Sequence, residues 1–511
     1  MAQPMIDVIV NFARTRPRDA FWLFVSVHVA LWTLLPALAY TSPPLDVVEG
    51  YGWGHEWQLG YIKHAPLPAW LLEAAYQATG GGVWTAYLLS QLCVAATLIA
   101  VWRLSEPMVG PMGALFAALA LEGVVYFTVL TPEFNHNVLQ MPLWAWASVH
   151  FHRALTRTGA RYWLFLAAEV ALLIYTKYSG ALLILVFALI AVTTAQGRAA
   201  LKTRWPYLSA LLALLLALPH LIWLIQSDFA TVAYAFDQQE AASFAGRLFY
   251  SGKFLAAQLM DHAPLFLVAA LATLSLRQPA AAREPLVVPL ARQSRFDRVF
   301  VAWIALAPVL IATLMALFLG IRFRTVWGAP MFAFSGLGLL LLAGETPVVR
   351  RPRACALLLI AYTLAIPVLH TAGQWVTPWL DRKPHRTIWP AETIAAAFSA
   401  AWTQQTGRPL AIVAGHSWLA GLIGLYGPDR PSVMAEASAA LNPWIDVAAI
   451  SANGALIVWP IRDGAPAGIP DAYRLGGASA EVRPPLTFAW PLGLPIAPIV
   501  VGWAVVPPQA E

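Results

Sequence analysis

Long apolar runs separated by short polar connectors recur through most of this sequence, and they constrain its fold more than any other feature. The chain is 59% hydrophobic and only 11% charged, whereas a soluble domain has about 25% charged residues. A helix that crosses a bilayer needs about 20 apolar residues. We therefore predict a mainly α-helical, polytopic membrane protein with about 11 transmembrane helices. The expected spans are residues 20–40, 83–102, 112–130, 135–152, 161–176, 178–195, 205–225, 256–276, 299–319, 327–343 and 354–371.

Basic residues divide unequally between the two sides of these spans. One side has only Lys63, Lys177, Arg247, Lys253, Arg322 and Arg324, and every other Lys or Arg before residue 372 lies on the opposite side. Cytoplasmic loops carry the excess of Lys and Arg, so the amino terminus is expected in the cytoplasm. Arginines on both flanks of 161–195 require a hairpin with its turn near 178–180. The run at 20–40 lacks a convincing cleavage site and is expected to be retained.

Net charge and cysteine content exclude several classes of protein. The formal charge of +6 comes from short basic runs between spans, which indicates topology rather than nucleic-acid binding. The two cysteines, Cys93 and Cys355, both lie inside apolar runs. A disulfide framework is therefore not expected, and two cysteines are too few for a Cys-based metal site.

The last part of the chain, residues 372–511, changes character. Its pattern alternates between helical and strand-like segments with many Pro and Gly residues between them. The expected elements are helices at 392–405 and 416–426 and strands at 409–414, 432–435 and 455–459. It contains no Gly-rich phosphate loop and no metal-spaced His/Cys cluster. We predict a transmembrane domain over 1–371 and a small periplasmic α/β domain over 372–511, because an odd number of spans places this tail outside.

The first outer connector concentrates polar and aromatic residues that a simple linker would not need. Asp46 directly follows the first span, Glu49 lies close to it, and Lys63 and His64 follow as a dipeptide. A carboxylate at this depth can act as a general base. Lys63 and His64 can neutralise a phosphate. A purely structural loop is the alternative interpretation of the same residues.

The end of this connector predicts an interfacial helix. One face has Leu67, Trp70, Leu71, Ala74 and Ala78 at helical spacing. Glu73 and Gln77 lie on the other face. Prolines at the start suit a first helical turn, and the segment is too short to span a bilayer. Its aromatic side chains serve either as membrane anchors or as substrate contacts.

Four segments together resemble the GT-C superfamily of membrane glycosyltransferases. They are Asp46-Val47 with Trp53 and Tyr61-Ile62-Lys63-His64-Ala65-Pro66-Leu67, then Thr131-Pro132-Glu133, then Tyr175-Thr176-Lys177-Tyr178-Ser179-Gly180, and last Arg322-Phe323-Arg324-Thr325-Val326-Trp327-Gly328-Ala329-Pro330. The resemblance is to the family 39 branch, which contains protein mannosyltransferases, the lipid A aminoarabinose transferase and rhizobial galacturonosyltransferases. It covers roughly residues 20–345. Val47 and Ala65 depart from the family pattern, which usually has an acidic residue and a proline there.

The resemblance implies roles for these residues. Asp46 would be the catalytic base and Glu133 a second acidic site residue, with Asn135 and His136 adding hydrogen bonds. The residues implied in substrate binding are Glu49, Lys63, His64, Lys177, Arg322 and Arg324. It also implies an inverting glycosyltransferase of the bacterial inner membrane. The donor would be a polyprenyl-phosphate sugar and the acceptor an envelope glycan, lipid A or protein.

Two other function classes stay open at this point. A transporter or flippase for a lipid-linked sugar would share the lipid cavity, and an envelope scaffold would use its outer domain to bind partners. For each cationic or acidic residue above, the alternative interpretation is a structural role, as a contact at a helix end or with a lipid headgroup. The expected partners are the lipid-linked donor, a glycan or lipid acceptor and membrane lipids. No cofactor is assigned, and dependence on a divalent cation is left open.

Overall fold

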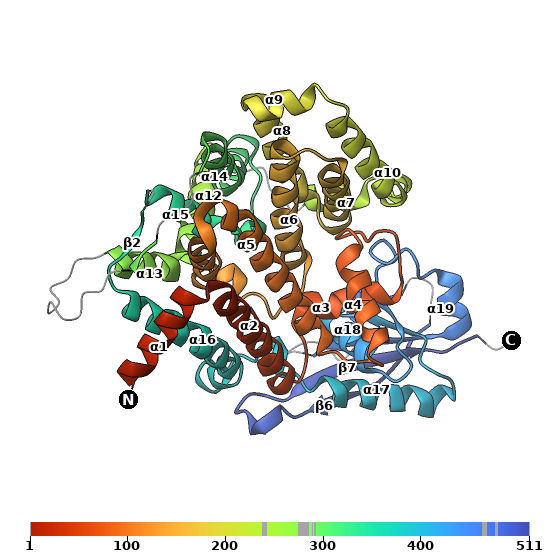
Figure 1. The fold of residues 1–511 in the computed structure, drawn as a ribbon. Coiled ribbons are helices and arrows are strands. Elements are labelled where there is room, and N and C mark those ends of the chain that lie inside the picture. Colours follow the sequence, from red (N-terminus) through yellow and green to blue (C-terminus); the bar gives the residue numbers. More distant parts are fainter. Residues whose placement is uncertain are drawn as a thin grey trace.

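The computed structural model describes residues 2–237, 243–273, 286–288, 290, 293–344, 346–461, 468–475 and 479–509. Helices build the chain as far as residue 381, and a five-stranded sheet with its own helices follows (Figure 1). The predicted fold class is thereby confirmed. Helices in the first half are α1 (Ala2–Thr15), α2 (Pro17–Ala39), α3 (Leu45–His55), α4 (Leu67–Ala78), α5 (Thr85–Leu119), η1 (Ala120–Gly123), η2 (Val125–Phe127), α6 (His136–Thr156), α7 (Ala160–Thr176), η3 (Tyr178–Gly180), α8 (Ala181–Thr193), α9 (Ala195–Leu201), α10 (Trp205–Gln226) and α11 (Ala230–Asp237).

The second half begins with further helices and ends with the sheet. Its elements are α12 (Phe244–Asp261), α13 (Ala263–Thr273), β1 (Leu286–Val287), α14 (Arg295–Leu319), η5 (Thr325–Phe332), α15 (Ser335–Leu342), β2 (Val348–Val349), α16 (Pro352–Asp381), η6 (Arg386–Ile388), α17 (Ala391–Thr406), β3 (Ile412–Gly415), α18 (Ser417–Tyr426), β4 (Ser432–Ala435), α19 (Val447–Asn453), β5 (Ala455–Pro460), η7 (Asp471–Tyr473), β6 (Glu481–Phe488), η8 (Pro491–Gly493) and β7 (Ile499–Val506). The short strands β1 and β2 pair with each other.

Several helices are long and apolar enough to cross a bilayer, so this is a multi-pass membrane protein. Among the described residues five qualify by length and composition: α2, α5 with η1, α10, α14 and α16. Three bent pairs also qualify if each counts as one span: η3–α8 with α9 at 97°, α12 with α13 at 53°, and η5 with α15 at 60°. The predicted total of 11 spans stays a prediction.

The helix boundaries match several expected spans and correct others. Both α7 and α10 lie within one residue of their predicted bounds, and the hairpin turn at 178–180 is present as η3. Gly110 breaks α5 with φ 74° and ψ 171°, so the expected spans 83–102 and 112–130 are two arms of a kinked helix. The second arm ends at Leu119 rather than 130, because 3-10 turns follow it.

Two further boundaries were predicted wrongly. The predicted span at 256–276 begins earlier, because α12 starts at Phe244. The side chain of Ser243 caps this helix by accepting a hydrogen bond from the backbone N–H of Gly246. Residues 274–276 lie outside the described part. The last long helix, α16, continues to Asp381 instead of ending at 371. The division into two domains at 371/372 therefore falls inside a helix and stays a prediction.

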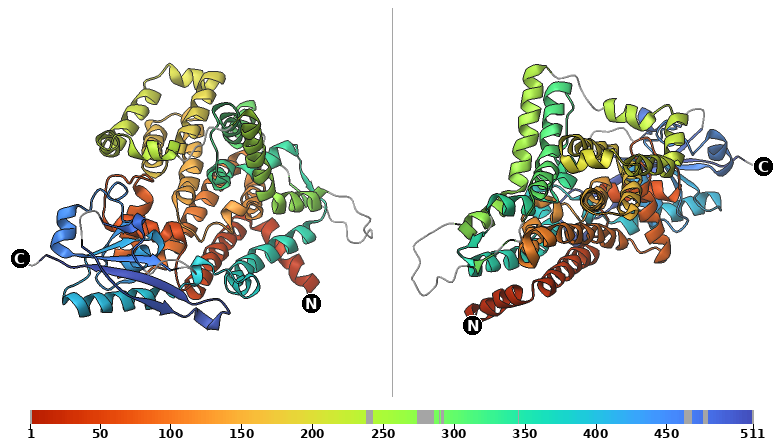
Figure 2. Two further views of the ribbon diagram at one scale, coloured as in Figure 1. Left: turned by 180° about the vertical axis from the view of Figure 1, so that it is seen from behind. Right: turned by 45° about the horizontal axis from the view of Figure 1, so that its top comes forward.

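A mixed five-stranded sheet organises the carboxy-terminal part. Its strand order is β4-β3-β5-β7-β6, with β3 parallel to β4 and β5, and β7 antiparallel to β5 and β6. Alternating residues of β5 face opposite layers: Leu456 and Val458 pack with α17 and α18, whereas Ile457 packs on the side of α19. Figure 2 shows α17 running along one face of the sheet. The predicted elements here are confirmed, whereas β6, β7 and α19 were missed.

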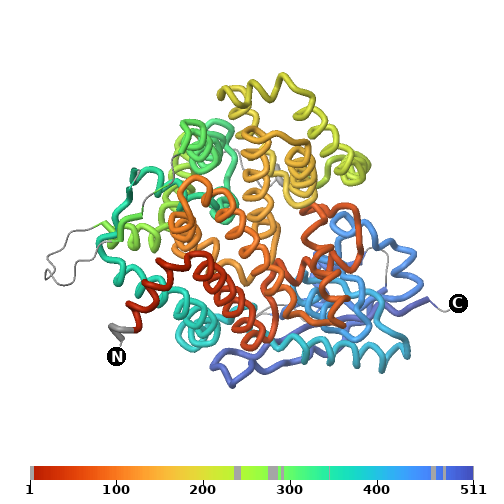
Figure 3. Tube along the Cα trace, viewed as in Figure 1, coloured from red at the N-terminus to blue at the C-terminus, as the bar shows by residue number. Residues whose placement is uncertain are grey.

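The sheet part packs directly against the first connector of the helical part. The tube trace in Figure 3 shows α3 and α4 beside the carboxy-terminal segment. Here α18 contacts α3. A Cβ added to Gly421 of α18 would lie 2.6 Å from Cγ1 of Val48 on α3, so glycine permits this close approach. Cys93 and Cys355 are free and buried, consistent with the expectation of no disulfide framework.

Candidate active site

Asp46 lies in the first turn of α3, where backbone N–H groups have no partner within the helix. The N–H of Asp46 donates to Oε1 of Glu133 at 3.0 Å. A carboxylate at a helix amino terminus is favoured by the helix dipole as well as by this hydrogen bond. Two acidic residues that are far apart in the sequence thus meet at one helix end.

Asn135 joins the same two elements from the other side. Its Oδ1 caps α6 by accepting from the N–H groups of Asn137 at 2.9 Å and Val138 at 3.2 Å. Its Nδ2 donates to Oδ2 of Asp46 at 3.0 Å. Because one amide both starts α6 and orients the Asp46 carboxylate, the position of the catalytic candidate depends on how this helix begins.

Burial and mutual repulsion change the acidity of this carboxyl pair. Burial and, after it, the negative charge of Asp46 together raise the pKa of Glu133 to about 7. Burial also raises the pKa of Asp46, and the hydrogen bond from Asn135 partly offsets that rise. Two close carboxyls share their titration, because the second charge is harder to form beside the first. The pair can therefore accept a proton near neutral pH, as a general base requires.

Three cations surround the pair and partly offset the effect of burial. The charges of Lys177, Arg324 and Lys63 each lower the pKa of Asp46. These residues come from three separate segments: the turn after α7, the segment before η5 and the α3–α4 connection. The structure thus brings the predicted cations Lys63, Lys177 and Arg324 together with the two predicted catalytic acids.

Lys177 is the most buried of these cations. Its Nζ donates to Oδ1 of Asn137 at 2.7 Å and lies 4.6 Å from the ring centroid of Trp327. Burial lowers the pKa of Lys177 to about 7, against the opposing attraction of Asp46. Such a lysine should bind an anionic ligand favourably, because the negative charge of the ligand raises the lysine pKa and keeps the amine protonated.

Lys63 is held by an acidic partner in the same connector. Its Nζ forms a salt bridge of 2.8 Å with Oε1 of Glu49. Although burial disfavours the charged amine, the carboxylate of Glu49 raises the pKa of Lys63. Glu49 is thus positioned to orient a lysine. A small cavity of about 30 Å³ adjoins this pair, and Ser417 and Asn442 of the carboxy-terminal part line its opposite side.

His64 and Arg322 both lie against other rings. The ring of His64 lies 3.9 Å from that of His136, between centroids. Burial, followed by the neighbouring His136, lowers the pKa of His64 well below its usual value, which favours the neutral imidazole. A role of His64 in binding a phosphate stays a prediction. Arg322 lies with its guanidinium 4.1 Å from the ring centroid of Tyr250.

The interfacial helix predicted after His64 is present as α4, but one residue of its polar face was assigned wrongly. Glu73 was expected on a polar face, yet its side chain is buried. Arg430 of the carboxy-terminal part donates to Oε2 of Glu73 at 2.8 Å. Gln77 donates to the other oxygen of Glu73 at 3.0 Å. Glu73 therefore packs against the carboxy-terminal part, whereas Gln77 on the same face is exposed as expected.

Sequence reasoning missed several residues that contribute to the site. Asn137 accepts a hydrogen bond from Lys177. The only feature of the sequence that pointed to Asn137 was its position close to Glu133. The charge of Arg386 lowers the pKa of Glu133. Arg386 belongs to η6 in the carboxy-terminal part, for which no site residue was predicted. Among the described residues, no group of three His, Cys, Asp or Glu side chains could hold a metal ion.

A family model and a solved structure match this chain. A family model described as dolichyl-phosphate-mannose-protein mannosyltransferase matches residues 63–223. The crystal structure of ArnT from Cupriavidus metallidurans bound to undecaprenyl phosphate has the same fold. Its TM-score is 0.57 at 13% identity, covering 94% of this chain and 97% of that chain.

The other comparisons add little. The Archaeoglobus fulgidus oligosaccharyltransferase in complex with Zn and sulfate gives a TM-score of 0.43 at 12% identity, covering 81% of this chain and 62% of that chain. This likeness is too weak to support a conclusion. No curated protein sequence matches the chain significantly. The match to the mannosyltransferase model and the fold shared over nearly the whole chain confirm the predicted resemblance: this multi-pass membrane protein is similar to the mannosyltransferase-like and aminoarabinose-transferase-like glycosyltransferases of the GT-C superfamily.

Proposed function

We propose that the protein is an inverting glycosyltransferase that moves a sugar from a polyprenyl-phosphate donor to an acceptor hydroxyl. One observation carries this proposal: a half-buried carboxyl pair, Asp46 and Glu133, lies within the electrostatic influence of Lys63, Lys177 and Arg324. A base beside cations is the chemical set needed to displace a phosphate from a sugar carbon. The ArnT structure contains bound undecaprenyl phosphate, which supports a lipid-phosphate donor.

In the proposed reaction, Asp46 takes the proton from an acceptor hydroxyl. The acceptor oxygen then forms a bond to the anomeric carbon, while the bond from that carbon to the phosphate oxygen breaks on the opposite face. Polyprenyl phosphate leaves with the electron pair. The positive charges of Lys177, Lys63 and Arg324 stabilise the developing phosphate charge in a water-poor site. Arg322 and the neutral His64 would contact the donor beside them.

Asn135 and Glu133 act on Asp46 rather than on the sugar in this proposal. The Asn135 amide orients one carboxylate oxygen, and Glu133 raises the proton affinity of the pair. Glu49 holds Lys63 in place through their salt bridge. We place the reaction at the periplasmic face of a bacterial inner membrane, with an envelope glycan, lipid A or protein as the acceptor. The carboxy-terminal part would cover the acceptor side.

The decisive experiment measures sugar transfer by purified wild type and Asp46→Asn in lipid nanodiscs. Radiolabelled undecaprenyl-phosphate sugars serve as donors, and lipopolysaccharide extracted from a deletion strain serves as the acceptor. We expect at least a hundredfold loss of transfer in the variant, because a general base contributes about 10²–10⁴ in rate. Asp381→Asn, an exposed carboxylate at the end of α16, is the matched control and should keep full activity.

Two outcomes would count against this proposal. Transfer that persists in Asp46→Asn would remove the base from the mechanism. Donor movement across proteoliposomes by wild type, without any glycosidic bond broken, would favour a flippase. Mass spectrometry of envelope glycans from the deletion strain gives an independent readout, since loss of one sugar substituent is expected.

A further inference from the structure

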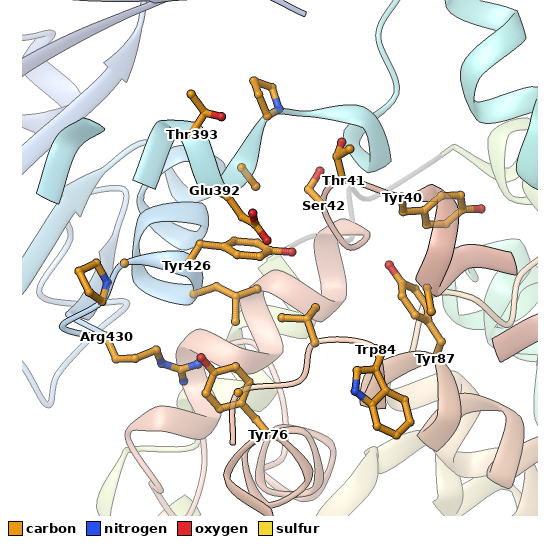
Figure 4. A pocket seen from close by; sticks show the side chains of 18 of the residues that line it. Tyr40, Thr41, Ser42, Tyr76, Trp84, Tyr87, Glu392, Thr393, Tyr426 and Arg430 are labelled. Carbon is orange, nitrogen blue, oxygen red and sulfur yellow. The ribbon is translucent and has the colours of Figure 1, made fainter. Parts of the chain in front are cut away.

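A cavity of about 720 Å³ lies between the helical part and the carboxy-terminal part, outside the carboxyl–cation site. Its walls come from the end of α2, the connection between α4 and α5, the start of α17 and the end of α18 (Figure 4). None of the residues proposed for transfer lines it. Ligand-binding cavities have volumes of about 300–1,000 Å³, so this one can hold more than one sugar ring.

Aromatic side chains with polar edges dominate the lining. They are Tyr40, Tyr76, Trp84, Tyr87 and Tyr426. The rings of Tyr40 and Tyr87 meet edge to face with centroids 5.9 Å apart. Such residues combine a flat apolar face with a hydrogen-bonding tip. A sugar has the complementary surface, since its C–H groups pack on rings and its hydroxyls bond to phenolic oxygens.

The charges in this cavity differ in kind from those around Asp46. Arg430 lines the cavity, but its charge is already compensated by the salt bridge of 2.8 Å to Glu73. Glu392 adds a negative charge, and Figure 4 shows its carboxylate beside the hydroxyl of Tyr426. Uncompensated negative charge disfavours a phosphate or another anion. The cavity is therefore suited to a neutral or an amino-substituted ligand.

Arg430, which lines the cavity, has one buried donor without a partner within the described residues. Nη1 of Arg430 has no hydrogen bond, although Nη2 bonds to Glu73 and the guanidinium lies 4.1 Å from the ring centroid of Tyr76. A buried unsatisfied donor is costly. A ligand hydroxyl would reach Nη1 once the guanidinium turns toward the cavity, and it would bring no charge. This is the same ligand chemistry that the tyrosine hydroxyls favour.

The chain connects this cavity to the reaction site over a short distance. Thr41 and Ser42 line the cavity, and α3, with Asp46 in its first turn, begins three residues after Ser42. The backbone N–H groups of Thr41 and Ser42 both donate to the carbonyl of Thr387, which ties the segment to the carboxy-terminal part. A ligand bound here would lie against the segment that leads into the catalytic helix.

We propose that this cavity binds the glycan part of the acceptor, a neutral or amino-sugar-containing oligosaccharide. The proposal that a glycan binds here depends only on the cavity, whereas its role as the acceptor rests on the proposed transferase function. Trp84 is 46% exposed at the rim and stacks on the ring that enters last. Tyr426, Glu392 and Arg430 bond to hydroxyl or amino groups deeper in the cavity.

Binding is measured first, without any donor, by isothermal titration calorimetry on the full chain in lipid nanodiscs. Nanodiscs avoid glycosidic detergents, which would compete for the cavity. The probes are maltotetraose, fully deacetylated chitotetraose and tetragalacturonate, which are neutral, cationic and anionic. We expect the first two to bind and the third to bind at least tenfold more weakly. No binding by any probe, or a preference for the anion, overturns the proposal.

Variants locate the binding. Trp84→Ala should weaken maltotetraose binding about three- to tenfold, because one aromatic contact is lost. Trp379→Ala, an equally exposed tryptophan on α16, is the control and should bind as wild type. Glu392→Gln should abolish the preference for the cationic probe over the neutral one. Unchanged binding in both Trp84→Ala and Glu392→Gln places the ligand elsewhere and refutes the assignment.

The acceptor role has a separate readout. With lipopolysaccharide as the acceptor, Trp84→Ala should raise KM for the acceptor and leave kcat within twofold of wild type. An unchanged KM, together with weakened probe binding, would refute the acceptor role and retain the glycan site. Repeating the calorimetry on Asp46→Asn keeps the two proposals distinguishable, because glycan binding should persist in a protein that no longer transfers sugar.

Discussion

The backbone N–H of Asp46 donates a hydrogen bond of 3.0 Å to the carboxylate of Glu133, although 87 residues separate them in the sequence. Asn135 also contacts this pair, because its side-chain amide donates a hydrogen bond of 3.0 Å to the Asp46 carboxylate. Two half-buried carboxyls held this close do not ionise independently. Their shared titration is the basis of the first prediction.

Replacing Glu133 by glutamine should move the acidic limb of the kcat/KM profile to lower pH. In wild type, burial and the charge of Asp46 raise the pKa of Glu133 to about 7, so the pair takes up a proton as the pH falls through this range. Without a second negative charge, Asp46 stays ionised to lower pH. Asp381→Asn is the control. A limb at the wild-type pH in Glu133→Gln would show that Glu133 does not influence the base.

Lys177 should determine the alkaline limb of the same profile. Burial lowers the pKa of Lys177 to about 7, so its charge is present at lower pH and is lost as the pH rises through this value. Arginine remains protonated throughout. Lys177→Arg should therefore extend activity to higher pH.

Lys177→Met provides the comparison for this experiment, since it removes the charge at every pH. We expect it to lower kcat/KM across the whole range and to leave no alkaline limb from this residue. Kinetics from pH 5.5 to about 9.5 cover both regimes, because lysine and histidine groups titrate within or near this interval. If Lys177→Arg is active below pH 7 but declines at the wild-type alkaline pH, another group sets that limb.

The salt bridge between Glu73 and Arg430 should stabilise the contact between α4 and the carboxy-terminal part. Both side chains are largely buried, at 3% and 16% exposure. Removing one partner leaves a buried charge, so Glu73→Gln should cost about 3 kcal/mol of unfolding free energy. Thermal unfolding in nanodiscs measures this loss.

Two comparisons make the salt-bridge prediction specific. The double variant Glu73→Leu with Arg430→Met should recover much of the stability, because neither charge is then left buried. Arg474→Ala breaks an exposed pair with Asp471 and should not change the midpoint measurably. Equal losses in the single and double variants would contradict a role for charge.

Packing between α3 and α4 should depend on Gly54. A Cβ at Gly54 would clash with the carbonyl oxygen of Ala69 and lie 2.8 Å from Cβ of Glu73. Gly54→Ala should therefore push the two helices apart, with a cost of about 1–3 kcal/mol and reduced transfer. Gly52→Ala lies on the same helix, and its Cβ would meet Val433 at an ordinary 3.7 Å. That control should be neutral or slightly stabilising, since alanine favours helix more than glycine does.

Much of the architecture could be predicted because it depends on local patterns. Apolar runs of helical length placed α6, α7 and α10, and short segments that follow a proline or glycine placed β4 and β5. Errors occurred where a local pattern was ambiguous. Arg103, Glu106 and two prolines suggested a connector at 103–111, yet α5 includes this segment with a break at Gly110. The helix α16 continues beyond its apolar stretch to Asp381. The long strands β6 and β7 lie among prolines and glycines that suggested a loop.

The sequence by itself determined the membrane class, the order of most helices and of three strands of the sheet, and the residue types at the candidate site, Asp46, Glu133 and Lys177 among them. These follow from composition, hydrophobic periodicity and motif spacing, which are properties of neighbouring residues. Only the tertiary structure decided that the Asp46 N–H meets Glu133, that His64 packs beside His136, and that Arg430 forms a salt bridge with the buried Glu73. Hydrogen bonding, desolvation and repulsion act over a few ångströms in space, and the residues that exert them come from segments far apart in the chain.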